Sequence, residues 1–150
     1  MKATLYADGA ARGNPGPAGS GALLLDERGK PLAELTLWLG HATNNVAEYR
    51  ALILGLEEAR RRGIDEIDVR LDSLLVVRQM QGLWKIKHPG LRPLAVRAGV
   101  LLAEFDRRTI EHIPREENSR ADALANKAID EAPAAKGGGE ADRREEGERP

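Results

Sequence analysis

Three strand-like segments follow one another at the start of this chain, before any helix is expected. Residues 2–7 alternate apolar and polar side chains and stop at Asp8-Gly9, and residues 32–39 alternate in the same way. Between them, residues 22–25 form a short apolar run that is bounded by turn-forming residues. Short connections between such segments favour a meander, so we predict three antiparallel strands.

The rest of the chain alternates helices with strands. Gly63 and Gly82 are suited to ending helices, and Pro93 is suited to beginning one. The predicted helices cover residues 43–62, 73–81, 93–107 and 119–131, and the predicted strands cover residues 66–71 and 109–113. This order predicts an α/β fold with a mixed five-stranded sheet, three antiparallel strands and then two parallel ones, and with helices on both faces.

The length of 150 residues suits one domain, which we assign to residues 1–131. Residues 132–150 have no aliphatic side chain larger than alanine, and they include three consecutive glycines and many charges. Such a segment cannot bury enough apolar surface to offset the entropy of ordering it, so we predict a disordered charged tail there.

Several classes of protein are excluded by what the sequence lacks. It has no cysteine, which excludes a disulfide scaffold, a zinc finger, an iron–sulfur site and a cysteine nucleophile. No apolar run is long enough for a signal peptide or a membrane span, so we expect a cytoplasmic protein with no membrane partner. The glycine-rich segment GNPGPAGSG matches neither a P-loop nor a dinucleotide-binding motif, and no organic cofactor is expected.

The charges are unevenly distributed, although the net charge is only −1. Residues 73–103 contain no Asp or Glu but carry five Lys and Arg residues together with Trp84. One interpretation is a surface that meets phosphate groups, with Trp84 as an apolar or stacking platform. The other is a pair of helices whose acidic residues happen to lie elsewhere, and the composition alone does not decide between them.

Four acidic residues occupy special places in the predicted elements: Asp8, Glu48, Asp72 and Asp122. Each has an ordinary explanation as a turn or helix-capping residue. Together they indicate a shared site. Two of them follow neighbouring strands, and the other two lie in the first turns of helices that can reach the same edge of the sheet. Oxygen ligands alone suit Mg²⁺ or Mn²⁺, and an acidic cluster that holds two such ions is suited to displacement at phosphorus.

The ordered motifs of residues 2–131 resemble those of type 1 ribonucleases H. Any one motif is weak, but all of them in this order are specific. They are Tyr6-Ala7-Asp8-Gly9, Gly13-Asn14-Pro15-Gly16-Pro17-Ala18-Gly19, Thr43-Asn44-Asn45-Val46-Ala47-Glu48-Tyr49, Asp72-Ser73, and His112-Ile113-Pro114-Arg115-Glu116-Glu117-Asn118 leading to Ala121-Asp122.

The resemblance implies an endonuclease that cuts the RNA strand of an RNA–DNA hybrid and leaves 3′-hydroxyl and 5′-phosphate ends. The implied catalytic metal ligands are Asp8, Glu48, Asp72 and Asp122, which would hold two Mg²⁺ ions that Mn²⁺ can replace. It also implies that Asn14, Asn44 and Asn45 follow the minor groove, where 2′-hydroxyls distinguish RNA, and that Thr43 contacts a phosphate of the DNA strand. A monomer with a hybrid duplex as its partner is expected.

The sequence departs from many bacterial members of the family in two places. A basic, tryptophan-rich helix, the handle, is missing, and only Leu83–Arg92 joins the flanking helices, so substrate binding there would depend on Trp84, Lys85 and Lys87. His112 fits the family histidine that assists proton transfer or product release, and Arg115 in the same loop is an alternative for that role or for substrate binding.

Two rival functions share this fold. One is a non-catalytic module that binds nucleic acid, which the presence of all four acidic residues disfavours. The other is a related nuclease that also cuts double-stranded RNA or RNA–DNA junctions, because the handle that would anchor a hybrid is missing. The sequence does not exclude the second.

Overall fold

The computed structural model describes residues 1–132, so the predicted tail at residues 132–150 lies outside the described residues except for its first residue. The helices and strands are β1 (Lys2–Ala11), β2 (Gly16–Leu25), β3 (Pro31–Ala42), α1 (Asn44–Arg61), β4 (Glu66–Leu71), α2 (Leu74–Met80), α3 (Arg92–Ala103), β5 (Arg107–His112), a short 3-10 turn (Arg115–Glu117) and α4 (Ser119–Asp130). Within this part of the chain, none of the helices has both the length and the apolar character needed to cross a bilayer.

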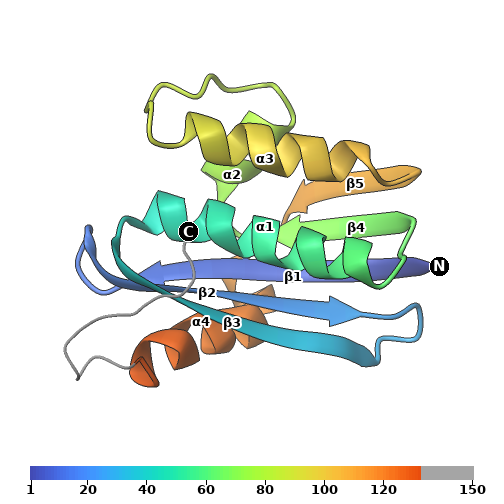
Figure 1. The fold of residues 1–150 in the computed structure, drawn as a ribbon, viewed down its shortest axis with the longest axis horizontal. Coiled ribbons are helices and arrows are strands. Elements are labelled where there is room, and N and C mark those ends of the chain that lie inside the picture. Colours follow the sequence, from blue (N-terminus) through green and yellow to red (C-terminus); the bar gives the residue numbers. More distant parts are fainter. Residues whose placement is uncertain (133–150) are drawn as a thin grey trace.

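The strands form one sheet in the order β3-β2-β1-β4-β5 (Figure 1). Neighbouring strands β1, β2 and β3 pair antiparallel, whereas β4 pairs parallel with both β1 and β5. The predicted mixed five-stranded sheet is therefore confirmed, and β1 is its central strand. The carboxyl ends of β1 and β4 lie at the same edge of the sheet because the two strands run in the same direction.

Helices cover both faces of the sheet, as predicted. On β2 the hydroxyl of Ser20 donates to the Ala47 carbonyl of α1, whereas a Cβ added to Gly19 or Gly21 would meet Ala125 of α4. Because alternate residues of a strand point to opposite faces, α1 and α4 lie on opposite sides of the sheet. Figure 1 shows α1 crossing in front of β1, with α2 and α3 near β4 and β5.

The main hydrophobic core lies between α1 and the sheet. The side chains of Leu5 on β1 and of Leu52 and Leu56 on α1 are fully buried in it. Gly55 belongs to the same face of α1, and a Cβ there would lie 2.3 Å from Cδ1 of Leu5. The small and apolar stripe of this helix thus faces the sheet, which holds the helix at a fixed distance from β1.

The boundaries of several elements differ from the predicted ones. The glycine-rich segment was predicted as a connection, but β2 begins within it, at Gly16. Gly19 and Gly21 serve there as packing residues, because their missing side chains let α4 approach the strand closely. Helix α3 ends at Ala103 rather than near residue 107, and β5 begins at Arg107, so the chain reverses direction earlier than the helical pattern suggested.

A carboxylate cluster at the ends of the central strands

The parallel pairing of β1 and β4 brings Asp8 and Asp72 together. Ala7 and Leu71 are register partners in the two strands, and the two aspartates are the residues that directly follow them. Asp8 lies within β1 and is 5% exposed, while Asp72 follows the last residue of β4. The sheet therefore presents two carboxylates side by side at its edge, where α/β folds collect their ligands.

Helix α1 adds Glu48 to this edge. The hydroxyl of Thr43 caps the helix by accepting a hydrogen bond from the Val46 N–H at 3.2 Å. Glu48 does not form the capping box that its spacing from Asn45 allowed, because its Oε1 accepts from the Gly9 N–H at 3.2 Å. A Cβ on Gly9 would lie 2.2 Å from the Ala47 carbonyl carbon, so only glycine allows this approach of the helix to the strand.

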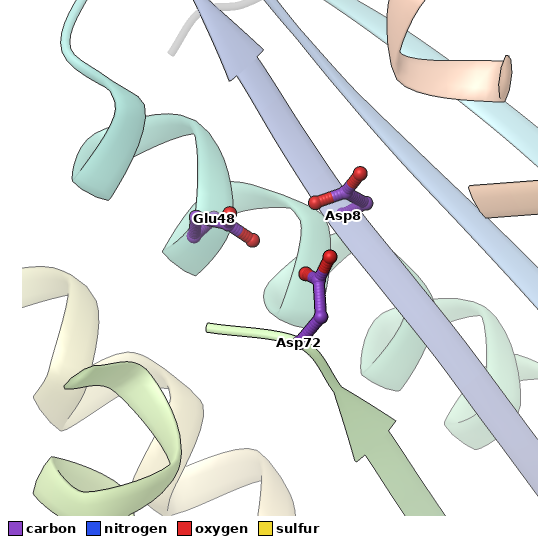
Figure 2. A group of neighbouring side chains, drawn as sticks. All are labelled: Asp8, Glu48 and Asp72. Carbon is purple, nitrogen blue, oxygen red and sulfur yellow. The ribbon is translucent and has the colours of Figure 1, made fainter. Parts of the chain in front are cut away.

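One carboxylate oxygen each from Asp8, Glu48 and Asp72 lies within 4.8 Å of the others. Figure 2 shows the three side chains pointing toward one another from β1, α1 and the end of β4. Bringing carboxylates together in a buried place changes the pKa values of Asp8 and Glu48. Burial, followed by repulsion from Glu48 and Asp72, raises the pKa of Asp8 to about 10, and burial and the charge of Asp72 raise the pKa of Glu48 to about 8.

Asp122 lies in the first turn of α4 and lines the same cavity of about 310 Å³ as the three clustered carboxylates. Its side chain also contributes to the raised pKa of Asp8. Ser119 does not cap this helix, since Asn118 occupies the N-cap and its buried Nδ2 donates to the Ala7 carbonyl at 3.0 Å. That bond joins the start of α4 to the residue before Asp8.

Arg115 and His112 occupy different places. Arg115 lines the carboxylate cavity, and its charge is among the influences that lower the pKa of Glu48 against the larger effect of burial. His112 is exposed at the end of β5, where it is the register partner of Leu71, and it is not one of the residues that line the cavity. Of the two residues considered for the same role, Arg115 therefore lies nearer to the carboxylates.

The predicted substrate residues near the start of α1 lie beside the carboxylate cavity. The side-chain oxygen of Asn14 accepts from the Asn44 N–H at 3.0 Å, which joins the β1–β2 connection to the helix. Asn44 lines the carboxylate cavity, and Asn45 lines a second cavity. Asn44 and Asn45 thus line neighbouring cavities at the start of α1, and Asn14 is hydrogen-bonded to Asn44.

The second cavity has a volume of about 540 Å³ and is lined by Trp84, Lys85 and Lys87. These residues belong to the segment 82–91 between α2 and α3, which we call the basic loop. Other cations of the acid-free stretch are engaged elsewhere, since Arg97 pairs with Glu57 and Arg78 donates to Gln81. Lys85 and Lys87 are the two lysines of the acid-free stretch, and both line this cavity.

Sequence reasoning missed Gln79, which lines the second cavity and is 8% exposed. The signal for it was present, because Gln79 follows Val76 by three residues and so shares the buried face of α2. A polar side chain on that face requires a buried partner.

Comparison with known proteins gives consistent results. A family model described as reverse transcriptase-like matches residues 6–128. The ribonuclease HI of Halobacterium salinarum is 52% identical over 127 residues, which is 85% of this chain and 64% of that protein. The crystal structure of RNase H1 from that archaeon superposes with a TM-score of 0.85 at 50% identity, over 88% of this chain and 100% of that one.

Two further proteins extend the comparison. The bifunctional protein Rv2228c of Mycobacterium tuberculosis is 51% identical over 133 residues, which is 88% of this chain and 36% of that protein. LC11-RNase H1, whose structure was solved in complex with an RNA/DNA hybrid, has a TM-score of 0.81 at 46% identity, over 87% of this chain and 98% of that one.

The chain thus spans only 36% of the mycobacterial relative and 64% of the halobacterial one. Most of its own length nevertheless matches them, and its fold agrees with that of the solved structures. The chain belongs to the ribonuclease HI family.

Proposed function

We propose that this chain is a metal-dependent endonuclease that hydrolyses the RNA strand of RNA–DNA hybrids and leaves 3′-hydroxyl and 5′-phosphate ends. The observation that carries the proposal is the group of carboxylates from Asp8, Glu48 and Asp72 within 4.8 Å of one another, with Asp122 in the same cavity. The similarity to LC11-RNase H1, which binds an RNA/DNA hybrid in its crystal structure, supports the choice of substrate.

The residues of the cluster suit divalent cations. They offer only carboxylate oxygens, which are the ligands that Mg²⁺ and Mn²⁺ prefer. The raised pKa values of Asp8 and Glu48 mean that negative charge is poorly compensated there, so bound cations would relieve repulsion. Two Mg²⁺ ions held by the four acids would supply a water of lowered pKa and stabilise the leaving 3′-oxygen.

The chain itself contributes orientation and charge. The Gly9 N–H holds the carboxylate of Glu48, and the Asn118 amide ties the start of α4 to β1 beside Asp8. Arg115 offers a cation in the same cavity for the scissile phosphate or the departing product. His112 at the end of β5 is the alternative for the proton-transfer role, and it would have to reach the cavity from outside.

Substrate selection is proposed to depend on the asparagines and on the two basic residues of the second cavity. Asn14, Asn44 and Asn45 carry amides that can bond 2′-hydroxyls in a minor groove, which requires one RNA strand. Thr43 would contact a phosphate of the DNA strand, and Trp84, Lys85 and Lys87 would bind the same strand further along. Because all four acids come from one chain, we propose that a monomer is active.

The experiment is a cleavage assay on four end-labelled substrates of one sequence: RNA–DNA hybrid, double-stranded RNA, double-stranded DNA and single-stranded RNA. Each is incubated with Mg²⁺, with Mn²⁺ and with chelator. The proposal expects cutting of the hybrid's RNA strand with either metal, no cutting of DNA, and slower cutting of double-stranded RNA with Mn²⁺. Equal rates on hybrid and double-stranded RNA would favour the rival nuclease, and metal-independent cutting would contradict the proposal.

A further inference from the structure

The basic loop has little regular structure of its own. Residues 82–91 contain no helix or strand, and all of them except Ile86 and the buried Leu91 are exposed. Ile86 packs against the hydrophobic core, so the loop is anchored near its middle. Its conformation must therefore depend on individual contacts with the flanking helices, because no ladder of backbone hydrogen bonds fixes it.

Two side chains hold consecutive carbonyls at the middle of this loop. From the α2 side, Nε2 of Gln79 donates to the Lys85 carbonyl at 3.1 Å. From the α3 side, Nε of Arg92 donates to the Ile86 carbonyl at 3.2 Å. The bond from Gln79 therefore fixes the backbone of Lys85, which is one of the two lysines that line the second cavity.

The side-chain oxygen of Gln79 accepts a second hydrogen bond, from a residue of α1, the helix that carries Glu48. The hydroxyl of Tyr49, which is fully buried, donates to Oε1 of Gln79 at 2.7 Å. Tyr49 directly follows Glu48 in α1. The two bonds of the amide fix its orientation, since Oε1 must accept from the hydroxyl while Nε2 donates to the carbonyl.

A continuous path of hydrogen bonds therefore joins α1, next to Glu48, to the basic loop: Tyr49, Gln79 and the Lys85 carbonyl. We propose that Gln79 is a positioning residue that, together with Tyr49, sets where the basic loop stands relative to the carboxylate cluster and so strengthens binding of the nucleic-acid strand that crosses the second cavity. This inference rests on the proposed function. Gln79 needs no contact with the substrate for this role.

Ordering the basic loop on binding would cost conformational entropy. A phosphate contact made by Lys85 or Lys87 contributes fully to affinity only if the loop is already in place before binding. Buried hydrogen bonds such as those of Gln79 are costly to break, so they keep the loop ordered in the free protein. Loss of the tie should weaken substrate binding and leave the chemical step at the carboxylates unchanged.

The test compares Gln79→Met, Gln79→Glu and Tyr49→Phe with the wild-type chain. Methionine keeps the volume and removes both bonds, glutamate keeps an acceptor for Tyr49 but loses the donor to Lys85, and phenylalanine removes only the hydroxyl. Gln81→Met is the matched control, because Gln81 lies two residues away and donates to the Ile110 carbonyl instead. Kinetics on the hybrid are measured, together with acrylamide quenching of Trp84 in a Trp38→Phe background.

The proposal expects Gln79→Met and Gln79→Glu to raise KM for the hybrid about tenfold while kcat stays within about twofold. Trp84 quenching should increase in both variants without substrate, Tyr49→Phe should show a smaller rise in KM, and Gln81→Met should match the wild-type chain. If Gln79→Met does not fold, Gln79→Glu and Tyr49→Phe carry the same test.

Unchanged KM and quenching in folded variants would overturn the proposal, and so would an equal effect of Gln81→Met. A fall in kcat with no change in KM would also overturn it. If the wild-type chain cuts no hybrid, the proposed function fails, and the quenching of Trp84 still decides whether Gln79 holds the basic loop.

Discussion

The N–H of Gly9 donates a hydrogen bond of 3.2 Å to Oε1 of Glu48, and this bond joins the central strand to the helix that packs on it. Glu48 is thereby held beside Asp8, the residue before Gly9. The contact depends on the absence of a side chain at Gly9, because α1 passes directly over that position. The geometry of the cluster and the packing of the fold therefore depend on the same residue.

We predict that Gly9→Ala destabilises the protein and removes most of its activity. The added Cβ would lie 2.3 Å from the Glu48 nitrogen, so the helix must move away from the strand. Overpacking of this kind costs about 1–3 kcal/mol, and displacement of Glu48 should lower kcat as well. Denaturant unfolding and hybrid cleavage measure the two effects.

Gly99→Ala is the control for that variant. Gly99 lies in α3, and a Cβ there would have its nearest neighbour at 4.0 Å. Alanine is favoured over glycine in a helix interior by about 0.5–1 kcal/mol, so this variant should be as stable as the wild-type chain or more so. If both variants lost stability equally, the close approach at Gly9 would not be the cause.

Asp8→Asn should stabilise the metal-free protein at pH 8. The pKa values of Asp8 and Glu48 are raised in the folded state, to about 10 and about 8, so the folded chain binds more protons than the unfolded one. Stability must then fall as the pH rises from about 4 toward these values. The variant removes one acid of the cluster and should gain about 1–3 kcal/mol at pH 8, with a weaker dependence on pH.

Thermal unfolding between pH 5 and pH 9 in chelator checks this prediction. Asp26→Asn is the control, because the pKa of Asp26 is lowered, chiefly by a hydrogen bond from the Lys30 backbone and also by one from the Arg28 backbone. The stability of Asp26→Asn at pH 8 should therefore not exceed that of the wild-type chain. In Mg²⁺ the wild-type chain should become more stable to heat than Asp8→Asn, since metal binding stabilises the chain that keeps all four acids.

Lys85→Ala combined with Lys87→Ala should weaken hybrid binding at low salt. The two lysines line the second cavity, and each phosphate contact that is lost should reduce the slope of log affinity against log salt by about one. The control replaces Lys2 and Lys30, which lie at the amino end of β1 and just before β3, away from the carboxylates. An unchanged slope in the first double variant would place the phosphate contacts elsewhere.

Thr43→Ala should have two separable effects. Loss of the cap on α1 costs about 1 kcal/mol, because the Val46 N–H loses its acceptor. If Thr43 also contacts the DNA strand, the ratio of hybrid to double-stranded RNA cleavage should fall, and Thr43→Ser should retain both properties. A loss of stability with an unchanged ratio would make Thr43 a helix cap only.

The order and direction of the strands could be predicted because they follow from local patterns. The strand at Glu66–Leu71 ends before Asp72 as predicted, whereas β1 continues past Asp8 to Ala11, because its last residues pair with β2. Asp8 and Asp72 still lie side by side, since each follows one of the register partners Ala7 and Leu71. The start of β2 could not be predicted in this way. Gly19 and Gly21 are typical of a connection in sequence, but here they make room for α4.

Contacts between residues far apart in the chain were the other limit of prediction. The spacing of Glu48 allowed a capping box, whereas its actual partner is the N–H of Gly9 on another element. The buried bonds of Gln79 likewise involve a helix and a loop that no local pattern relates. Long-range partners of this kind depend on the packed structure.

The most direct test of the account is single-turnover cleavage of a saturating RNA–DNA hybrid by the wild-type chain and by Asp8→Asn, in Mg²⁺, with hybrid affinity measured in parallel. Asp8 is the acid most closely surrounded by the others, since Glu48, Asp72 and Asp122 all help to raise its pKa. We predict that Asp8→Asn cleaves at a rate at least about a thousandfold lower, with hybrid affinity equal to or higher than that of the wild-type chain. Cleavage by Asp8→Asn within about tenfold of the wild-type rate would contradict metal-dependent hydrolysis at this cluster.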